Sequence, residues 1–503
     1  MPAEPDVVAT NPPIVLAFAC YLLLMLAIGY VGWRRTQSLA DYILGGRRLG
    51  RWVAALSAGA SDMSGWLLLG LPGYAYASGL ESGWLVVGLL AGTWLNWRLV
   101  AERLRRYTER AHNALTLPDF FERRFADASR SLRLVSALFI LVFFTFYTGS
   151  GLVAGGKLFN AVFGVDYLWA VAIGAAVIVA YTFMGGFLAV AWTDLVQALL
   201  MLFALLIVPV AVLQQIGGPE DAAALVEARN AHLLSPFTDS GGGTLSLIAV
   251  LSLLGWGLGY FGQPHILARF MAIADPDQVP KARRIAVTWS GLGMAGAVLV
   301  GIAGIGYLEP ALTGADAEKV FIHLVGAVFH PLPAGVLLAA ILAAIMSTAD
   351  SQLLVASSAL TEDFYRALYR RGASERELVW VGRGAVAAIA LLALFIARDA
   401  DSRVLDLVAY AWAGFGAAFG PVVLLGLFWR RMTAGGALAG MLVGGITVIV
   451  WKQLEGGLFD LYEIIPGAVL ATVAILTVSL LGRPPPAPVT ALFDEVSARG
   501  GGG

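Results

Sequence analysis

Thirteen apolar stretches, each long enough to cross a lipid bilayer, run through the 503 residues of this chain. A helix needs about 20 predominantly apolar residues to span the hydrocarbon core. The chain is 59% hydrophobic and 13% charged, with a mean hydropathy of +0.78, which argues against a soluble globule. We predict an all-α integral membrane protein with about 13 transmembrane helices, at 14–33, 52–74, 79–100, 132–158, 167–185, 190–213, 245–264, 285–308, 331–357, 378–397, 404–428, 433–452 and 461–481.

A single membrane domain is expected over residues 1–503. The longest polar connections lie at about 101–131, 214–244 and 309–330, and each is too short for an independent soluble core. The only cysteine, Cys20, lies in the first stretch, where we expect a small buried apolar residue. No disulfide framework or thiolate metal site follows from one cysteine, and no cofactor or obligate protein partner is indicated.

The basic residues are distributed unevenly between alternate loops. With the N-terminus outside, the cytoplasmic loops carry 27 of the 33 lysines and arginines, and the opposite loops carry six. In this count Arg269 belongs to the cytoplasmic loop that ends at Arg284. Because positive residues stay on the cytoplasmic side of a membrane, we predict an extracellular N-terminus and a cytoplasmic C-terminus in a cytoplasmic (inner) membrane. The net charge of −1 gives no reason to expect a nucleic-acid partner.

The second stretch is interrupted by polar residues from Ser57 to Gly65, a run that contains Asp62, three serines and two glycines. A charged side chain at membrane depth costs at least about 2.5 kcal/mol. Glycine destabilises a helix by about 1 kcal/mol relative to alanine. We therefore interpret this segment as an ion and substrate site.

A second interruption, 255–264, holds four glycines and a proline in ten residues. The segments 52–74 and 245–264 each begin a group of five spans, and five is odd, so the two groups have opposite orientations. Paired broken helices in an inverted repeat point to a transport site near the bilayer midplane. We expect a first repeat at 52–213 and a second at 245–428, with one span before them, two after them at 433–481 and a tail at 482–503.

A stripe of hydroxyl groups is the third signal. On a helix, Ala344, Ser347, Thr348 and Ser351 fall on one face. Oxygen ligands suit a small hard cation. Alternatively, Ser and Thr in membrane helices bond back to carbonyls of their own helix. The nearby broken helix, which would offer free carbonyls, favours an ion site.

Several long motifs carry a resemblance to a known family. They are DYILGGR at 41–47, AALSAGASDMSGWLLLGLPG at 54–73, GGFLAVAWTD at 185–194, GWGLGYFGQPHILARFM at 255–271, ILAAIMST at 341–348 and YAWAGFGAAFGPVV at 410–423. With these motifs the chain resembles the proline-transporting members of the sodium:solute symporter family. The resemblance implies a LeuT-type 5+5 inverted-repeat core in spans 2–11, working by alternating access, and sodium-coupled uptake of L-proline across the cell membrane.

The family's sodium site maps onto five residues of this sequence. The resemblance implies ligation by the backbone carbonyls of Ala60, Met63 and Ala344 and by the hydroxyls of Ser347 and Thr348. Neutral oxygens of this kind can replace the hydration shell of a sodium ion where a helix is unwound.

Four charged residues are candidates for the ion path. Asp62 either compensates the charge of sodium, shapes its entry or pairs with a neighbouring polar group. By resemblance Asp194 lies on the inward sodium route, although an exposed helix cap is also possible. Asp350 is a candidate carboxylate either behind the sodium ligands or on the sodium exit. Arg47 is either functional, by its match to the family, or a simple orientation charge.

Proline is a zwitterion with an apolar ring, so its site should combine polar and aromatic surfaces. Ser64 and Gly65 can present a hydroxyl and backbone amides to the carboxylate. Trp256 and Tyr260, joined by Tyr147, offer aromatic faces to the ring and the ammonium. Pro264 either lines the pocket or only enforces the break.

The sequence is also compatible with other functions. A related symporter could carry a different small solute or couple to protons, and a membrane sensor could use the same fold. No nucleophile–histidine pair, metal motif or cofactor box indicates an enzyme. Gly257-x-Gly259-x-x-Gly262 matches a dinucleotide-binding motif, but it follows no strand, opens no βαβ unit and lies in an apolar span, so a nucleotide site is not expected. The glycines at 436, 440 and 444 predict close helix packing, within the chain or with a second protomer.

Overall fold

The computed structural model describes residues 11–36, 38–184 and 186–499 of the chain. The two ends, which carry the predicted extracellular N-terminus and the last residues of the predicted cytoplasmic tail, lie outside the described residues. The α-helices are α1 (Pro12–Arg35), α2 (Leu39–Leu44), α3 (Arg51–Asp62), α4 (Leu71–Ser78), α5 (Ser82–Leu99), α6 (Ala101–Arg110), α7 (Leu117–Phe125), α8 (Ser131–Phe163), α9 (Tyr167–Met184), α10 (Phe187–Ile216), α11 (Pro219–Asn230), α12 (Leu247–Gly255), α13 (Pro264–Ala272), α14 (Val279–Tyr307), α15 (Val320–Val328), α16 (Pro331–Ser358), α17 (Glu375–Ile396), α18 (Val404–Phe428), α19 (Ala434–Trp451), α20 (Ile464–Leu481) and α21 (Ala487–Arg499).

Shorter helical turns join these helices. The 3₁₀ turns are η2 (Gly45–Arg47), η4 (Gly79–Glu81), η5 (Ala231–Leu234), η6 (Trp256–Gly262), η7 (Pro276–Gln278), η8 (Gly314–Lys319) and η10 (Gly457–Asp460), and the π-helical segments are η3 (Trp66–Gly70) and η9 (Ala359–Tyr369). Every regular element of the described residues is helical, which confirms the predicted all-α membrane architecture.

Each of the thirteen predicted stretches overlaps a helix or a broken helix. By length and composition alone, ten helical segments qualify as spans, or eleven when the bent pair Leu247–Gly262 and Pro264–Ala272 is one span. The count is lower than 13 for two reasons. The second stretch is split, and its later half continues into α5 and α6 as one helical run, Trp66–Arg110. The apolar part of α9, Tyr167–Ala180, is shorter than a full span.

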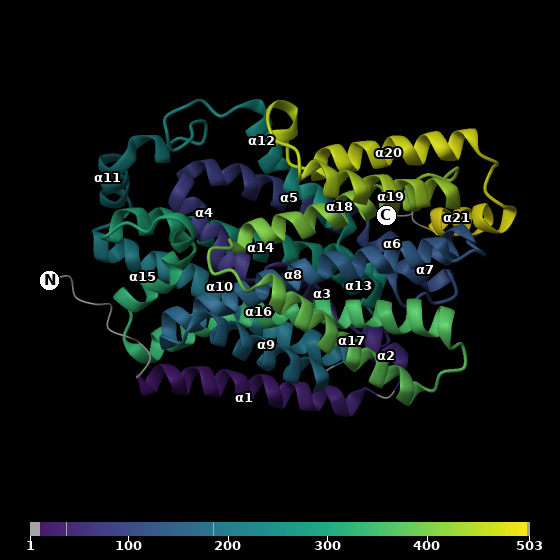
Figure 1. Cartoon of the computed structure of the whole chain (residues 1–503), viewed down its shortest axis with the longest axis horizontal. Coiled ribbons are helices and arrows are strands. Elements are labelled where there is room, and N and C mark those ends of the chain that lie inside the picture. The colour runs from purple at the N-terminus through teal and green to yellow at the C-terminus, as the bar shows by residue number, and fades with distance from the viewer. Residues whose placement is uncertain (1–10, 37, 185, 500–503) are drawn as a thin grey trace.

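The loops gather at two ends of an elongated helix bundle. Figure 1 shows α6, α7 and α21 at one end and α11 and α15 at the other. At the first end, Leu49 pairs with Ile273 through a β-bridge, and Arg106 lies 2.6 Å from Asp277. The loops that meet here are those with most of the basic residues, so we call this the arginine-rich end.

The two predicted interruptions are breaks in the helices. The second stretch leaves helical geometry at Met63, where φ is −84° and ψ is 74°, and resumes at η3. The seventh stretch narrows to the 3₁₀ turn η6 and then bends by 46° before α13. Pro264 is the first residue of α13, where a proline costs no helical hydrogen bond.

Glycines let η6 pack directly against the backbone of α5. A Cβ atom added to Gly257 would lie 2.2 Å from the carbonyl oxygen of Gly88. That contact is far inside van der Waals distance, so the two backbones would have to separate. Close approach, not turn geometry, is the reason for glycine at this position.

We expect Gly257→Ala to lower the stability of the protein in detergent by about 1–3 kcal/mol, the usual cost of overpacking. Thermal unfolding of the purified protein measures the effect. Gly326→Ala in α15 is the matched control, because a Cβ there meets nothing within 4 Å. Equal melting temperatures for the two variants would contradict the packing argument.

Two expectations about single positions are decided by the fold. Cys20 is exposed on the surface of α1, so the prediction of a buried residue is wrong. The helix carries other apolar residues on its outer face, which a bilayer would cover. The glycines of α19 pack within the chain: a Cβ on Gly440 would meet Ile475 of α20, and one on Gly444 would meet the backbone of Ala417 in α18.

Candidate functional site

The break in the second span frees a backbone carbonyl. In an intact helix the amide of Ser64 would bond to the carbonyl of Ala60, but here it donates to the carbonyl of Asp62 at 3.0 Å. The amide of Met63 still donates to Gly59 at 2.8 Å. The carbonyl of Ala60 is therefore left for side chains of another helix.

Hydroxyl groups of α16 reach this carbonyl. Ser347 Oγ donates to the Ala60 carbonyl at 2.8 Å and also lies 3.1 Å from the Ala344 carbonyl, and Thr348 Oγ1 lies 3.2 Å from the Ala60 carbonyl. All four residues are buried. A hydroxyl that donates to a carbonyl can rotate and present a lone pair to a cation. The structure thus brings together four of the five predicted sodium ligands. The fifth, Met63, lies at the break, three residues after Ala60.

Asp62 lies at the same break, fully buried. Tyr260 donates its hydroxyl to Asp62 Oδ2 at 2.7 Å, and no hydrogen bond reaches Oδ1 from the described residues. The backbone carbonyl of Asp62 accepts from Tyr147 Oη and Trp66 Nε1, both at 3.0 Å. Two of the predicted substrate aromatics therefore converge on one residue of the break.

The remaining substrate candidates lie in different surroundings. Gly65 is buried so closely against α8 that a Cβ would lie 2.6 Å from the side chain of Ala154, and Ser64 Oγ accepts weakly from the amide of Trp66 at 3.4 Å. Trp256 stacks on Tyr462 with ring centroids 5.4 Å apart. It lines a cavity of about 620 Å³ that opens at the end opposite the arginine-rich one. Pro264 lies on the other side of η6 and faces a separate crevice.

Trp412 of α18 was not predicted from the sequence. Its ring packs edge-on against Tyr260 at 4.9 Å between centroids, and its Nε1 donates to the Trp256 carbonyl at 2.7 Å. It contacts both Trp256 and Tyr260 of η6. Trp412 lies in YAWAGF, a motif that carries the family resemblance, but no local pattern in the sequence indicates its contact with η6.

A buried ion pair lies deeper toward the arginine-rich end. Arg269 Nη2 is 3.2 Å from Asp194 Oδ2, and both side chains are fully buried. Ser57 Oγ donates to the same carboxylate oxygen at 2.6 Å and lies 3.1 Å from Arg269 Nε. Arg269 also bonds to Ser351 Oγ. One network thus links α3, α10, α13 and α16.

This network corrects two interpretations. Arg269 is not a loop charge, because it lies within the bundle on α13, the second half of the broken span. Asp194 is not an exposed helix cap, because α10 begins at Phe187 and buries it. The hydroxyl stripe also divides: Ser347 and Thr348 face Ala60, whereas Ser351 faces Arg269 and donates to the Ser347 carbonyl at 2.7 Å.

Asp350 and Arg47 occupy different surroundings. Asp350 is buried on α16, where its Oδ1 lies 3.3 Å from Ser351 Oγ, so it borders the same network. Arg47 lies outside the break. Its guanidinium donates to Asn113 Oδ1 and the Ala114 carbonyl, both at 2.8 Å, and to the carbonyl of Met271. These bonds tie the α2–α3 and α6–α7 connections to the last turn of α13 at the arginine-rich end.

Comparison with known proteins identifies the family of this chain. The sequence profile of the Sodium:solute symporter family matches residues 42–444. The chain belongs to the sodium:solute symporter family. The predicted resemblance is therefore confirmed, and so is the prediction that the chain is a transporter and not an enzyme. This chain is 54% identical to the sodium/proline symporter of Escherichia coli K12, over 97% of each chain.

Other relatives extend the comparison. This symporter is 52% identical to the high-affinity proline transporter PutP of Bacillus subtilis 168, over 94% of its own chain and 98% of the relative. Among solved structures, it is similar to a Na⁺-coupled sialic acid symporter in a substrate-bound outward-open state, with a TM-score of 0.77, 20% identity and 94% and 98% coverage. It is also similar to Mhp1, a nucleobase-cation-symport-1 family transporter, with a TM-score of 0.57, 15% identity and 92% and 100% coverage. These two likenesses show the fold.

Proposed function

We propose that this chain couples the inward movement of sodium to the uptake of L-proline across a cytoplasmic membrane, by alternating access. The observation that carries the proposal is the meeting of two segments 287 residues apart, where Ser347 donates to the Ala60 carbonyl freed by the helix break. Curated relatives that match nearly the whole chain are proline transporters by name.

In the proposed sodium site, Ala60, Met63 and Ala344 supply carbonyl oxygens and Ser347 and Thr348 supply hydroxyl oxygens. These ligands are neutral, and Asp62 provides negative charge at the same break. A sodium ion held there joins α3 to α16. These two helices must stay together while the cavity beside Trp256 is open. Sodium entry gains about 2.3 kcal/mol per 100 mV of inside-negative membrane potential.

In the proposed substrate site, the hydroxyl of Ser64 and backbone amides at Ser64 and Gly65 bind the carboxylate of proline. Trp256, Tyr260 and Tyr147 cover its ring and ammonium, and Pro264 bounds the site toward α13. Tyr260 contacts Asp62, so the substrate and ion sites share one hydrogen bond. That bond is a direct physical route for coupling the two ligands.

The proposed orientation places the arginine-rich end in the cytoplasm. The cavity of about 620 Å³ beside Trp256 then opens to the outside. Asp194 and Asp350 lie on the cytoplasmic side of the sodium ligands along α10 and α16, which suits a path for sodium release.

The decisive experiment is uptake of labelled proline into proteoliposomes that contain the purified protein. An inward sodium gradient should drive accumulation, and a potassium gradient of the same size should not. Competition by unlabelled amino acids, sugars and carboxylates tests the alternative of another solute. Sodium-driven uptake of another solute without proline uptake would refute the proposed substrate, and proline accumulation driven equally by a proton gradient would refute the coupling ion.

We expect Tyr260→Phe to weaken proline binding at saturating sodium by about tenfold or more, because hydrogen bonds to charged groups contribute roughly 1.5–3 kcal/mol. The variant keeps the ring and removes the hydroxyl that Asp62 accepts. Tyr462→Phe is the control, since the hydroxyl of Tyr462 bonds to the Ala409 carbonyl at 2.7 Å, away from Asp62. Equal affinities in a proline-binding assay for the two variants would contradict the shared hydrogen bond.

A further inference from the structure

Two cavities meet at Thr116, near the arginine-rich end. The first is a narrow crevice that begins at Pro264 and passes between α13, α8 and α16, with Ala268, Ile140 and Val355 among its lining residues. It has room for about one water molecule, with a volume of about 20 Å³. The second is a vestibule of about 330 Å³ lined by Asp119 and five arginines, among them Arg133. Leu115 and Thr116 line both cavities.

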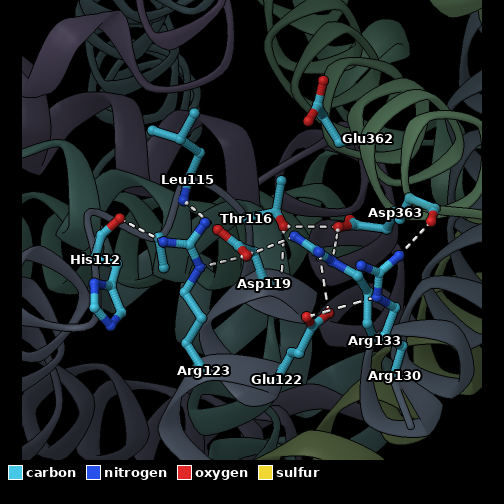
Figure 2. Close-up of polar contacts among 12 residues, drawn as sticks. His112, Leu115, Thr116, Asp119, Glu122, Arg123, Arg130, Arg133, Glu362 and Asp363 are labelled. Carbon is cyan, nitrogen blue, oxygen red and sulfur yellow. Dashed lines mark hydrogen bonds and ion pairs between the residues drawn. The ribbon is translucent and has the colours of Figure 1, made fainter. Parts of the chain in front are cut away.

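A polar cluster closes the junction between them. Asp363 of η9 is fully buried, and its Oδ1 accepts from Arg133 Nε at 2.8 Å and from Thr116 Oγ1 at 3.2 Å. Arg133 also lies 3.0 Å from Glu122 and 2.5 Å from Asp119. Figure 2 shows Arg133 between these carboxylates, with Thr116 and Asp363 on one side of it.

The cluster joins moving parts of the proposed transporter. Thr116 is the residue before α7, Asp119 lies in α7 and Arg133 lies in α8. In contrast, η9, which carries Asp363, continues directly from α16. Helix α16 carries the proposed sodium ligands Ser347 and Thr348. A displacement of α16 would therefore pull Asp363 away from Thr116 and Arg133, at the point where the crevice meets the vestibule.

The crevice is separate from the buried Arg269–Asp194 pair. Pro264, Ala268 and Met271 are spaced at i, i+4 and i+7 on α13 and line the crevice together. Arg269 points from the opposite side of the same helix toward Asp194 and Ser57. Helix α13 thus divides a mostly apolar passage, which begins at a proposed substrate residue, from a charged one.

We propose that proline leaves for the cytoplasm through this crevice and that the Asp363–Thr116–Arg133 contact holds the passage shut until α16 moves. The proposal rests on the proposed function and orientation. The apolar crevice wall suits the pyrrolidine ring. A buried ion pair separates only when its charges find new partners, and water entering from the vestibule supplies them. Asp363, Thr116 and Arg133 are positioning residues that act on access, not on substrate affinity.

Accessibility of Ala268 tests the proposal without any need for proline. The chain has one cysteine, so Cys20→Ala gives a cysteine-free background for the reporter substitution Ala268→Cys. A membrane-impermeant maleimide is then applied from the cytoplasmic side of inside-out vesicles. We expect Asp363→Asn to speed labelling by roughly tenfold, the effect of a modest shift toward the open state. Thr116→Val should act in the same direction by a smaller factor and keeps every charge.

The controls separate gating from general damage. Asp494→Asn removes the same charge from another arginine pair, 2.7 Å from Arg430, that borders neither cavity, and it should leave the labelling rate unchanged. Asp363→Glu should restore slow labelling. Unchanged labelling in both Asp363→Asn and Thr116→Val would overturn the proposal, as would equal acceleration by Asp494→Asn.

A transport measurement distinguishes this proposal from the proposed function. In Asp363→Asn, proline efflux from loaded proteoliposomes should speed up relative to the parent while sodium-dependent accumulation falls. Proline transport that is normal in both directions, with unchanged labelling, would overturn the gate and leave the symport function standing. Faster labelling in a protein that does not carry proline would support the gate and overturn the proposed substrate.

Discussion

Replacing both Ser347 and Thr348 by alanine is expected to raise the sodium concentration for half-maximal proline uptake by about a hundredfold. Each hydroxyl is one of few oxygen ligands, and a tenfold loss for each corresponds to about 1.4 kcal/mol. The Ala60 carbonyl that accepts both hydroxyls would remain in the bundle without partners. Sodium titrations of proline uptake in proteoliposomes, with each single variant beside the double variant, measure the effect.

The matched control for this prediction is Thr472→Ala in α20. The hydroxyl of Thr472 bonds back to the Ala468 carbonyl of its own helix at 2.8 Å, which is the ordinary role of threonine in a membrane helix. Its removal should leave the sodium dependence unchanged. If the double variant keeps the parent's sodium dependence, Ser347 and Thr348 are structural and the proposed sodium site is wrong.

Replacing Arg269 by glutamine is expected to destabilise the protein by about 3–5 kcal/mol, the usual cost of removing one partner of a buried ion pair. The carboxylate of Asp194 would keep only Ser57 Oγ as a side-chain donor among the contacts described. Asp350 lies beside the same network and would lose a nearby positive charge. Thermal unfolding in detergent and the yield of folded protein measure the loss.

A second substitution tests the cause. The double variant Arg269→Gln/Asp194→Asn removes both charges and keeps the shapes of the side chains, so it should recover a large part of the lost stability. Sodium-driven uptake should stay impaired, because the carboxylate on the proposed release path is gone. A double variant less stable than Arg269→Gln alone would show that the unpaired charge of Asp194 does not cause the loss of stability.

The two broken spans illustrate what could be predicted. Each break costs free energy in its own segment, through glycines, a proline or a charge, so the residues themselves mark it. The hydroxyl stripe is also predictable from the sequence, because helical spacing places its residues on one face. The number of spans was harder to count, because a helix that breaks and then continues into its neighbour, as at Trp66–Arg110, has no single boundary in the sequence.

Arg269 illustrates what was missed. It follows an apolar segment and precedes three more basic residues, so its position along the chain is that of a loop charge. Its burial depends on the 46° bend after η6, which keeps α13 inside the bundle. Only the folded chain brings Asp194 to it, 75 residues away.

The sequence by itself determined that the chain is an all-α membrane protein, where two of its apolar stretches break and which helix face carries hydroxyls. These properties arise from the local cost of each residue type in an apolar helix, which neighbouring residues suffice to show. The tertiary structure decided which freed carbonyl meets which hydroxyl, that Tyr260 donates to Asp62 across 198 residues, and that Arg133 donates to Asp363 beside a crevice. Such contacts depend on how helices distant in the chain pack, and every one of those helices has several apolar faces that could pack.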